Sequence, residues 1–299
     1  MKSIYLTMKR FILLIVVLGM HGEVSYCDEM KKIQWYTSEF PPAFIKEGKL
    51  KGTGFGTETL SILQAGLPEY THQRRWASVA RIYADMKEGK NLCSHVNVST
   101  PERNKVAIFS NNITTPSLRI IMSQPVYQQY FFNQNSLSLE SLLNDTRFRM
   151  GIAHERSYGL IVSPIIAKYQ TQKNVFIRAG TDLSVGLVKM LDLNRIDYVT
   201  EFSWVLNYIK RNSNLENSFQ VLKIQEIQDL KDQYMVGGVA CTRNAWGKHV
   251  IEKIDQASLR DTIQMRTKVE EWLNPEEIPS FRKAWNILII EPLRKKINQ

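Results

Sequence analysis

Residues 86–103 read MKEGKNLCSHVNVSTPER, and the pair Phe109-Ser110 follows six residues later. The hydrophobic spacing predicts a helix over 79–87 and a strand over 92–98, and this strand ends in the turn Thr100-Pro101-Glu102-Arg103. A helix that leads into a strand after a short connection is one unit of an alternating α/β fold.

The same alternation continues on both sides of this stretch. Further strands are expected at 32–36, 118–122, 149–152, 175–178 and 196–200, and further helices at 57–65, 159–169, 183–193 and 203–210. From residue 246 onward the pattern is wholly helical, so this last part must pack on an existing sheet. The short connections predict parallel sheets covered by helices, and the length suffices for two of them.

The first 27 residues have the pattern of a secretory signal. Lys2, Lys9 and Arg10 precede an apolar run over 11–20, and a polar stretch then ends at Cys27. Ten apolar residues span about 15 Å as a helix, roughly half of a bilayer core, which favours a cleaved signal over the alternative of an uncleaved anchor. We therefore expect a soluble mature chain that begins at Asp28 and resides in the periplasm.

Composition and charge exclude several classes of protein. The chain has 299 residues, of which 43% are hydrophobic and 23% charged, as in ordinary globular domains. Loss of the signal lowers the formal net charge from +10 to +8, but the basic residues are scattered, so we expect a solvated surface and no nucleic-acid partner. An oxidising compartment permits a bridge between Cys93 and Cys241, although two cysteines are too few for a disulfide scaffold.

Motifs of metal and nucleotide chemistry are missing from the sequence. The five histidines include no i, i+4 pair, and there is neither a phosphate-binding Gly-Lys-Ser/Thr loop nor a Gly-x-Ser-x-Gly turn. We expect no metal and no cofactor.

Four segments carry a resemblance to a known family. They are Phe40-Pro41-Pro42 with the glycines of 52–56, residues 86–103 with Phe109-Ser110, residues 151–159, and residues 194–197. From about residue 33 to 285 the chain resembles family 3 of the periplasmic solute-binding proteins, the amino-acid-binding proteins of ABC importers. It is similar to a divergent branch of that family, with Cys93 entering the strand before the Thr-Pro-Glu-Arg turn.

The resemblance implies a two-lobed type II periplasmic binding protein-like α/β fold. Each lobe would be a mainly parallel sheet flanked by helices, and a hinge of two crossovers would join them near 114–117 and 241–244. Lobe 1 would comprise 28–115 and 243–299, lobe 2 would comprise 116–242, and residues 1–27 would be the signal peptide. We expect a monomer that partners a small-molecule solute and either an ABC permease or a membrane receptor.

In lobe 1 the resemblance assigns the carboxylate of the ligand to Arg103. A guanidinium matches a carboxylate through two parallel hydrogen bonds, whereas the alternative is a surface arginine that closes the turn. Phe40 and Trp76 fall where the family places rings around the body of the ligand, with core packing as the alternative. Glu39 beside Phe40 is a further candidate.

In lobe 2 the first candidate is Ser157, which matches a family threonine at a helix N-terminus. Such a site favours an anionic group, although Ser157 could serve as a helix cap without a ligand. Tyr158 replaces a smaller residue there. Phe202 stands where the family has the aspartate that receives an ammonium group, and Glu201 is the nearby acid, so a plain α-amino acid is a doubtful ligand.

The strand before Arg103 also departs from the family pattern. Val98 replaces a hydroxyl residue, and Asn97 or Ser99 could supply the missing hydrogen bonds. His95 is either a titrating contact or, as is more usual for one histidine in a strand, a packing residue.

These observations favour an extracytoplasmic binding protein that closes on a small carboxylate-bearing solute and is not an enzyme. Two alternatives stay open. One is a ligand-sensing or interaction protein that docks on a membrane receptor. The other is a dehydratase-like enzyme on the same fold that uses Glu39, His154 or Glu201 as its acid or base.

Overall fold

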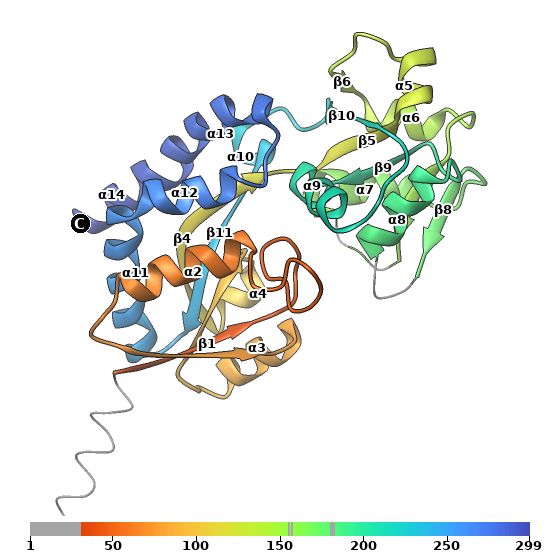
Figure 1. The fold of residues 1–299 in the computed structure, drawn as a ribbon. Coiled ribbons are helices and arrows are strands. Elements are labelled where there is room, and N and C mark those ends of the chain that lie inside the picture. Colours follow the sequence, from red (N-terminus) through yellow and green to blue (C-terminus); the bar gives the residue numbers. More distant parts are fainter. Residues whose placement is uncertain (1–30, 155, 157, 180–182) are drawn as a thin grey trace, which may run out of the picture.

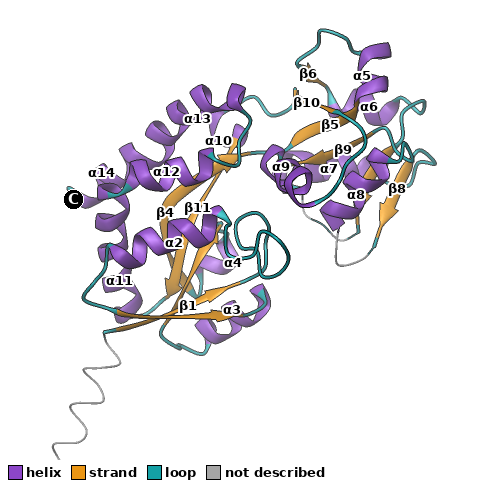
Figure 2. Cartoon of the chain, viewed as in Figure 1, coloured by secondary structure: helices purple, strands orange, loops and turns teal. Residues whose placement is uncertain are grey.

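The computed structural model describes residues 31–154, 156, 158–179 and 183–299. It has two bodies, each with a sheet and flanking helices (Figures 1 and 2). The two-lobed α/β fold expected from the sequence is thereby confirmed. The predicted signal peptide lies outside the described residues, and no helix within them is long and apolar enough to cross a membrane.

The first lobe is built on a five-stranded sheet of order β2-β1-β3-β11-β4. β1 runs parallel to β2 and β3, whereas β11 runs antiparallel to β3 and β4. Its strands are β1 (Lys32–Thr37), β2 (Thr71–Trp76), β3 (Leu92–Asn97), β4 (Ala107–Pro116) and β11 (Tyr234–Thr242). Its helices are α2 (Phe55–Ala65), α3 (Val79–Lys87), α4 (Pro101–Asn104), α10 (Leu230–Gln233), α11 (Ala245–Arg260), α12 (Thr262–Glu270), η1 (Pro275–Glu277), α13 (Ile278–Trp285), η2 (Asn286–Ile290) and α14 (Glu291–Ile297).

The second lobe is built on a six-stranded sheet of order β6-β10-β5-β9-β7-β8. β7 is parallel to β8 and β9, and β5 is antiparallel to β9 and β10. Its strands are β5 (Arg119–Ser123), β6 (Ser136–Leu137), β7 (Met150–Ala153), β8 (Val175–Arg178), β9 (Tyr198–Glu201) and β10 (Phe219–Ile224). Its helices are α5 (Gln124–Tyr130), α6 (Leu139–Asn144), α7 (Gly159–Tyr169), α8 (Leu183–Asp192) and α9 (Ser203–Asn212).

The elements with clear periodicity form where the sequence places them. β1 alternates around the fully buried Ile33 and Trp35, and α3 begins after Ser78, whose hydroxyl accepts a hydrogen bond from the backbone N–H of Arg81. By contrast, β2 reads THQRRW and was not expected, because it is an edge strand with most of its side chains exposed. Its hydrogen bonds to β1, rather than an apolar pattern, make it a strand.

The second boundary between the lobes differs from the one expected. Residues 234–242 form β11, which pairs with β3 and β4 in the first sheet, whereas the sequence-based boundary assigned them to lobe 2. The chain thus returns to the first lobe through the segment between β10 and β11, which includes α10 (Figure 1). The pairing partners of β11 lie more than a hundred positions earlier in the chain, and no local pattern reveals them.

Cys93 and Cys241 form a disulfide between β3 and β11. Both side chains are fully buried in the first lobe. The bridge joins residues 148 positions apart, so the covalent loop that it closes contains the entire six-stranded sheet.

Candidate functional site

The carboxyl ends of β1, β2 and β3 bring several predicted side chains to one edge of the first sheet. These strands are parallel neighbours, and ligands of open α/β sheets bind at such an edge. Phe40 follows β1 and Trp76 ends β2, and both rings are incompletely buried, with 40% and 44% of their surface exposed. Their exposure argues against the alternative in which these two rings are ordinary core residues. Glu39 is exposed beside them.

Arg103 lies in the short helix α4 just beyond β3. Thr100 caps this helix, because its hydroxyl accepts a hydrogen bond from the backbone N–H of Arg103. The guanidinium donates to the carbonyl oxygen of Val98 at 2.9 Å and lies 4.8 Å from the centre of the Tyr83 ring. Arg103 is half-buried, so these contacts position its guanidinium while part of the side chain stays accessible.

Tyr83 is a residue of this edge that sequence reasoning missed. It lies in α3, and its hydroxyl donates to the side-chain oxygen of Asn97 at 3.0 Å. Burial raises the pKa of Tyr83, although the nearby Arg103 acts in the opposite direction. Only its place in α3, directly before the 92–98 strand, could have pointed to it.

Asn97 and Ser99 make their hydrogen bonds within the first lobe. The buried Asn97 amide donates to the Ser94 hydroxyl and to the His95 carbonyl, and its oxygen accepts from Tyr83. The Ser99 hydroxyl donates to the Asn104 side chain. In this arrangement Asn97 supports Tyr83, which in turn supports Arg103.

A strained residue shapes the end of β3. Val96 has φ of 59°, in the left-handed region that a β-branched residue rarely adopts. The register between β3 and β11 shifts close to this point, and a Cβ on Gly237 would lie only 2.7 Å from the Asn97 carbonyl oxygen. Because Gly237 has no Cβ, its backbone can lie close to the Asn97 carbonyl oxygen at this irregular end of β3.

His95 is a packing residue, which was one of the two expectations. Its ring is buried beside Phe44, and one ring nitrogen lies 2.9 Å from the Thr59 hydroxyl. Burial lowers the pKa of His95 from 6.5 to about 3.

The depressed pKa of His95 predicts acid sensitivity. Between about pH 6.5 and 3 the unfolded chain protonates this histidine and the folded chain does not, so the free energy of unfolding falls as pH falls. The expected slope is about 1.4 kcal/mol per pH unit for this one proton. Urea unfolding at several pH values should show a flatter decline for His95→Asn than for the parent. Equal slopes would contradict the prediction.

In the second lobe Arg156 and Glu201 form a buried ion pair beside the carboxyl ends of β7 and β9. The two guanidinium nitrogens lie 2.5 and 2.7 Å from the two carboxylate oxygens, and Arg156 also donates to the Ser184 hydroxyl. Burial alone would lower the pKa of Arg156, but the charge and hydrogen bonds of Glu201 outweigh it and raise the pKa. Glu201, a candidate acid or base of the enzyme alternative, thus has both oxygens bound to a cation.

Aromatic rings surround this pair. The Arg156 guanidinium carbon lies 5.1 Å from the centre of the Tyr158 ring and 5.8 Å from that of Phe202. Tyr158 is buried, and its hydroxyl accepts a hydrogen bond from the Ala153 backbone N–H. Ser157, the other predicted residue here, lies outside the described residues, and His154 is exposed.

The two lobes meet through α9. Trp204 of this helix is 1% exposed and packs edge-on against Phe40 and Phe55 of the first lobe, with ring centres 5.7 and 5.8 Å apart. It also stacks on Phe202 at 4.7 Å, and its indole N–H donates to the carbonyl oxygen of Pro116 at the end of β4. Phe40 therefore lies where the lobes touch, and α9 occupies the same junction in Figure 1.

Polar contacts continue this junction toward the C-terminal helices. The Ser203 hydroxyl donates to Glu277, and Arg119 of β5 lies 3.9 Å from the same carboxylate. The Asn207 amide donates to the Trp272 carbonyl and to the Asn274 side chain. These apolar and polar contacts together hold the two lobes in their relative orientation in this structure.

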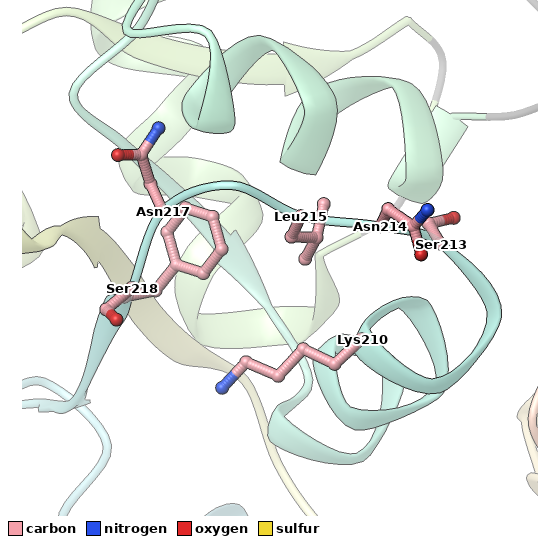
Figure 3. Close-up of a pocket in the computed structure, with 7 residues that line it drawn as sticks. Lys210, Ser213, Asn214, Leu215, Asn217 and Ser218 are labelled. Atoms are coloured by element: carbon pink, nitrogen blue, oxygen red, sulfur yellow. The ribbon is translucent and has the colours of Figure 1, made fainter.

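Two cavities of the second lobe lie away from these residues. One, of about 570 Å³, lies between α9 and the loop that leads to β10, with Lys210 extending along it (Figure 3). Burial lowers the pKa of Lys210. The other, of about 330 Å³, is lined by α5 and α6 residues such as Tyr130 and Leu142. Neither is lined by any of the residues expected to bind a ligand.

The described ranges contain no group of three His, Cys, Asp or Glu side chains placed as metal ligands would be. The candidate side chains are instead a half-buried guanidinium and aromatic rings in the first lobe, and an ion pair within the second lobe. Such a set can hold an anion with a flat or apolar body.

The fold is that of the two-lobed periplasmic binding proteins. It is similar to the probable amino-acid ABC transporter extracellular-binding protein YtmK from Bacillus subtilis, with a TM-score of 0.61, 15% identity, and coverage of 82% of this chain and 98% of that one. An ancestral cationic amino acid solute-binding protein gives a TM-score of 0.61 at 15% identity, with 84% and 100% covered. The sequence itself matches no protein-family model and no curated protein.

Proposed function

We propose that this protein is an exported solute-binding protein that captures a small carboxylate-bearing solute between its two lobes. The observation that carries the proposal is the cluster at the carboxyl ends of β1 to β3. There the accessible guanidinium of Arg103 lies at the same sheet edge as the incompletely buried rings of Phe40 and Trp76. Amino-acid ABC transporter binding proteins are among the structures that share its fold, which supports a solute-binding role.

The mechanism we propose is closure of the lobes around the solute. The solute binds the first lobe at Arg103, and contacts from the second lobe around Arg156 and Tyr158 then favour the closed state. Within the part of the chain that the structure describes, two segments connect the lobes, one between β4 and β5 and one between β10 and β11. A dissociation constant in the micromolar range, about 8 kcal/mol of binding free energy, suits such capture and release.

The proposed location is the periplasm, and the proposed partner is the permease of an ABC importer. The signal-like first 27 residues and the buried disulfide support an oxidising, extracytoplasmic compartment. A sensing role is the second candidate, because a histidine kinase sensor domain shares the fold with a TM-score of 0.57 at 16% identity, covering 83% of this chain and 100% of that one.

Arg103→Ala is expected to weaken binding of a carboxylate solute by about 100-fold or more. The substitution removes two charge-assisted hydrogen bonds, which together contribute about 3 kcal/mol. A melting-temperature screen of small carboxylates with the mature protein first identifies the solute, and calorimetric titration then compares the two proteins.

Arg103→Lys is the matched control, since it keeps the positive charge and loses the planar fork. We expect it to recover only part of the affinity. If Arg103→Ala binds the solute as well as the parent while both are folded, Arg103 is not part of the site. If the solute is chemically converted during the titration, the enzyme alternative replaces the binding function.

A further inference from the structure

We infer that Arg156 is an internal cation that determines specificity, and that the solute is a carboxylate without an ammonium group. The inference rests on the proposed binding function and names its substrate class. The Arg156–Glu201 pair lies at the carboxyl end of β9 and is linked to the first lobe by a row of ring contacts. Arg156 lies against Phe202, Phe202 stacks on Trp204, and Trp204 packs on Phe40.

The carboxylate of Glu201 is buried and paired within the protein. Its side chain is 2% exposed, and each of its oxygens accepts a hydrogen bond from Arg156 at 2.7 Å or less. One of the two oxygens also accepts the backbone N–H of Phe202. A buried charge that is paired and hydrogen-bonded in this way is costly to separate, because removal of its partner leaves an uncompensated ion.

The Arg156 guanidinium is also held by several contacts within the second lobe. Arg156 is 16% exposed, bonds to Ser184 through a nitrogen that also contacts Glu201, and lies against the rings of Tyr158 and Phe202. An ammonium group that sought Glu201 would have to displace this guanidinium from two hydrogen bonds and two ring contacts. The guanidinium thus occupies, within the protein, the place that a ligand cation would take.

The other acidic side chains beside the junction do not replace Glu201. Among the residues that the structure describes there, Glu277 accepts from Ser203 and lies near Arg119, and Glu39 is exposed to water. An exposed carboxylate attracts an ammonium group only weakly, because water screens the pair. An ammonium group buried at the junction would lose its hydration without a buried carboxylate in return.

The remaining charge of the candidate site, at the carboxyl edge of the first sheet, favours an anion. Arg103 is accessible and bonded to a neutral carbonyl oxygen and a ring, so its charge has no carboxylate partner among its described contacts. The exposed rings of Phe40 and Trp76 suit an apolar or flat body. A carboxylate with such a body, and without an amine, matches all of these groups.

The first test uses the unmodified mature protein and matched ligand pairs. Each pair contains an amino acid and the same carboxylate without its amine, such as L-phenylalanine with 3-phenylpropanoate and L-leucine with 4-methylpentanoate. The panel extends to polar side groups. Calorimetric titration should give dissociation constants at least about tenfold lower for the amine-free member of the best-bound pair. Tighter binding of the amino acid overturns the inference.

The second test exchanges the internal cation. Arg156→Gln frees the Glu201 carboxylate and should shift the ratio of the two affinities at least about tenfold toward the amino acid. The double variant Arg156→Gln/Glu201→Gln removes the freed charge and should abolish this shift. An unchanged ratio in a folded Arg156→Gln protein overturns the assignment, and if that variant does not fold, the ratio measured with the parent decides.

The outcomes separate the inference from the function on which it rests. If no member of any pair binds the parent, the proposed carboxylate-binding function fails, and the inference fails with it. If amino acids bind tightly and the binding depends on Arg103, the function stands and only the substrate class is wrong.

Discussion

Replacing Cys93 and Cys241 together by alanine is expected to lower the free energy of unfolding by about 5 kcal/mol. The bridge closes a loop of 148 positions, and in the chain-entropy account a loop of this length restricts the unfolded chain by about that amount. Alanine fits the two fully buried positions without introducing a polar group. The loss therefore reports on the bridge more than on packing.

Urea unfolding measures this loss of stability in three samples. They are the oxidised parent, the parent with a reductant, and the double alanine variant. The last two proteins should have similar stabilities, both well below that of the oxidised parent. A difference of less than about 1 kcal/mol between the variant and the oxidised parent would show that the bridge does not form or does not constrain the chain.

Trp204→Ala is expected to lower the free energy of unfolding by about 3 to 5 kcal/mol and to uncouple the lobes. The substitution leaves a large cavity among Phe40, Phe55 and Phe202, and it removes the hydrogen bond to the Pro116 carbonyl. Because these contacts join the two lobes, their loss should allow each lobe to unfold separately. Calorimetric scanning should then show two transitions where the parent shows one.

Trp204→Phe is the control for this prediction. A phenyl ring retains much of the apolar contact and loses the indole N–H donor, so the expected loss is smaller than that of alanine by about half or more. A single, unshifted transition in Trp204→Ala would mean that α9 does not couple the lobes.

The coupling through α9 bears on how the lobes could close. Ser203, Trp204 and Asn207 all contact the first lobe from a helix of the second. A hinge movement that separates α9 from Phe40 would have to break these contacts, so solute binding must repay that free energy. Variants of Trp204 should consequently change solute affinity as well as stability.

Much of the fold could be predicted because its elements carry local signals. The 32–36, 79–87 and 159–169 predictions correspond to β1, α3 and α7, where alternation or helical spacing marks the buried face. The edge strand β2 lacks such a pattern, and the membership of β11 depends on strands far away in the chain. Local patterns therefore identified elements, while pairing between distant elements remained hidden.

The sequence suggests residues for the candidate site, but it does not reveal their contacts. The turn that contains Arg103 is a contiguous motif, so the sequence points to it directly. The pairing of Arg156 with Glu201 joins positions 45 apart, and the packing of Trp204 on Phe40 joins different lobes. No spacing rule encodes such pairs, since they form only when β7, β9 and α9 reach their places.

The amino-acid sequence by itself determined an alternating α/β chain with a wholly helical C-terminal part, a signal-like N-terminus and an arginine after a strand, because each of these is written in neighbouring residues. Only the tertiary structure decided that β11 closes the first sheet, that the two cysteines meet, and that Glu201 is already satisfied by Arg156. Such contacts depend on which distant strands become neighbours, and that is settled by the joint burial of many side chains and not by any one segment.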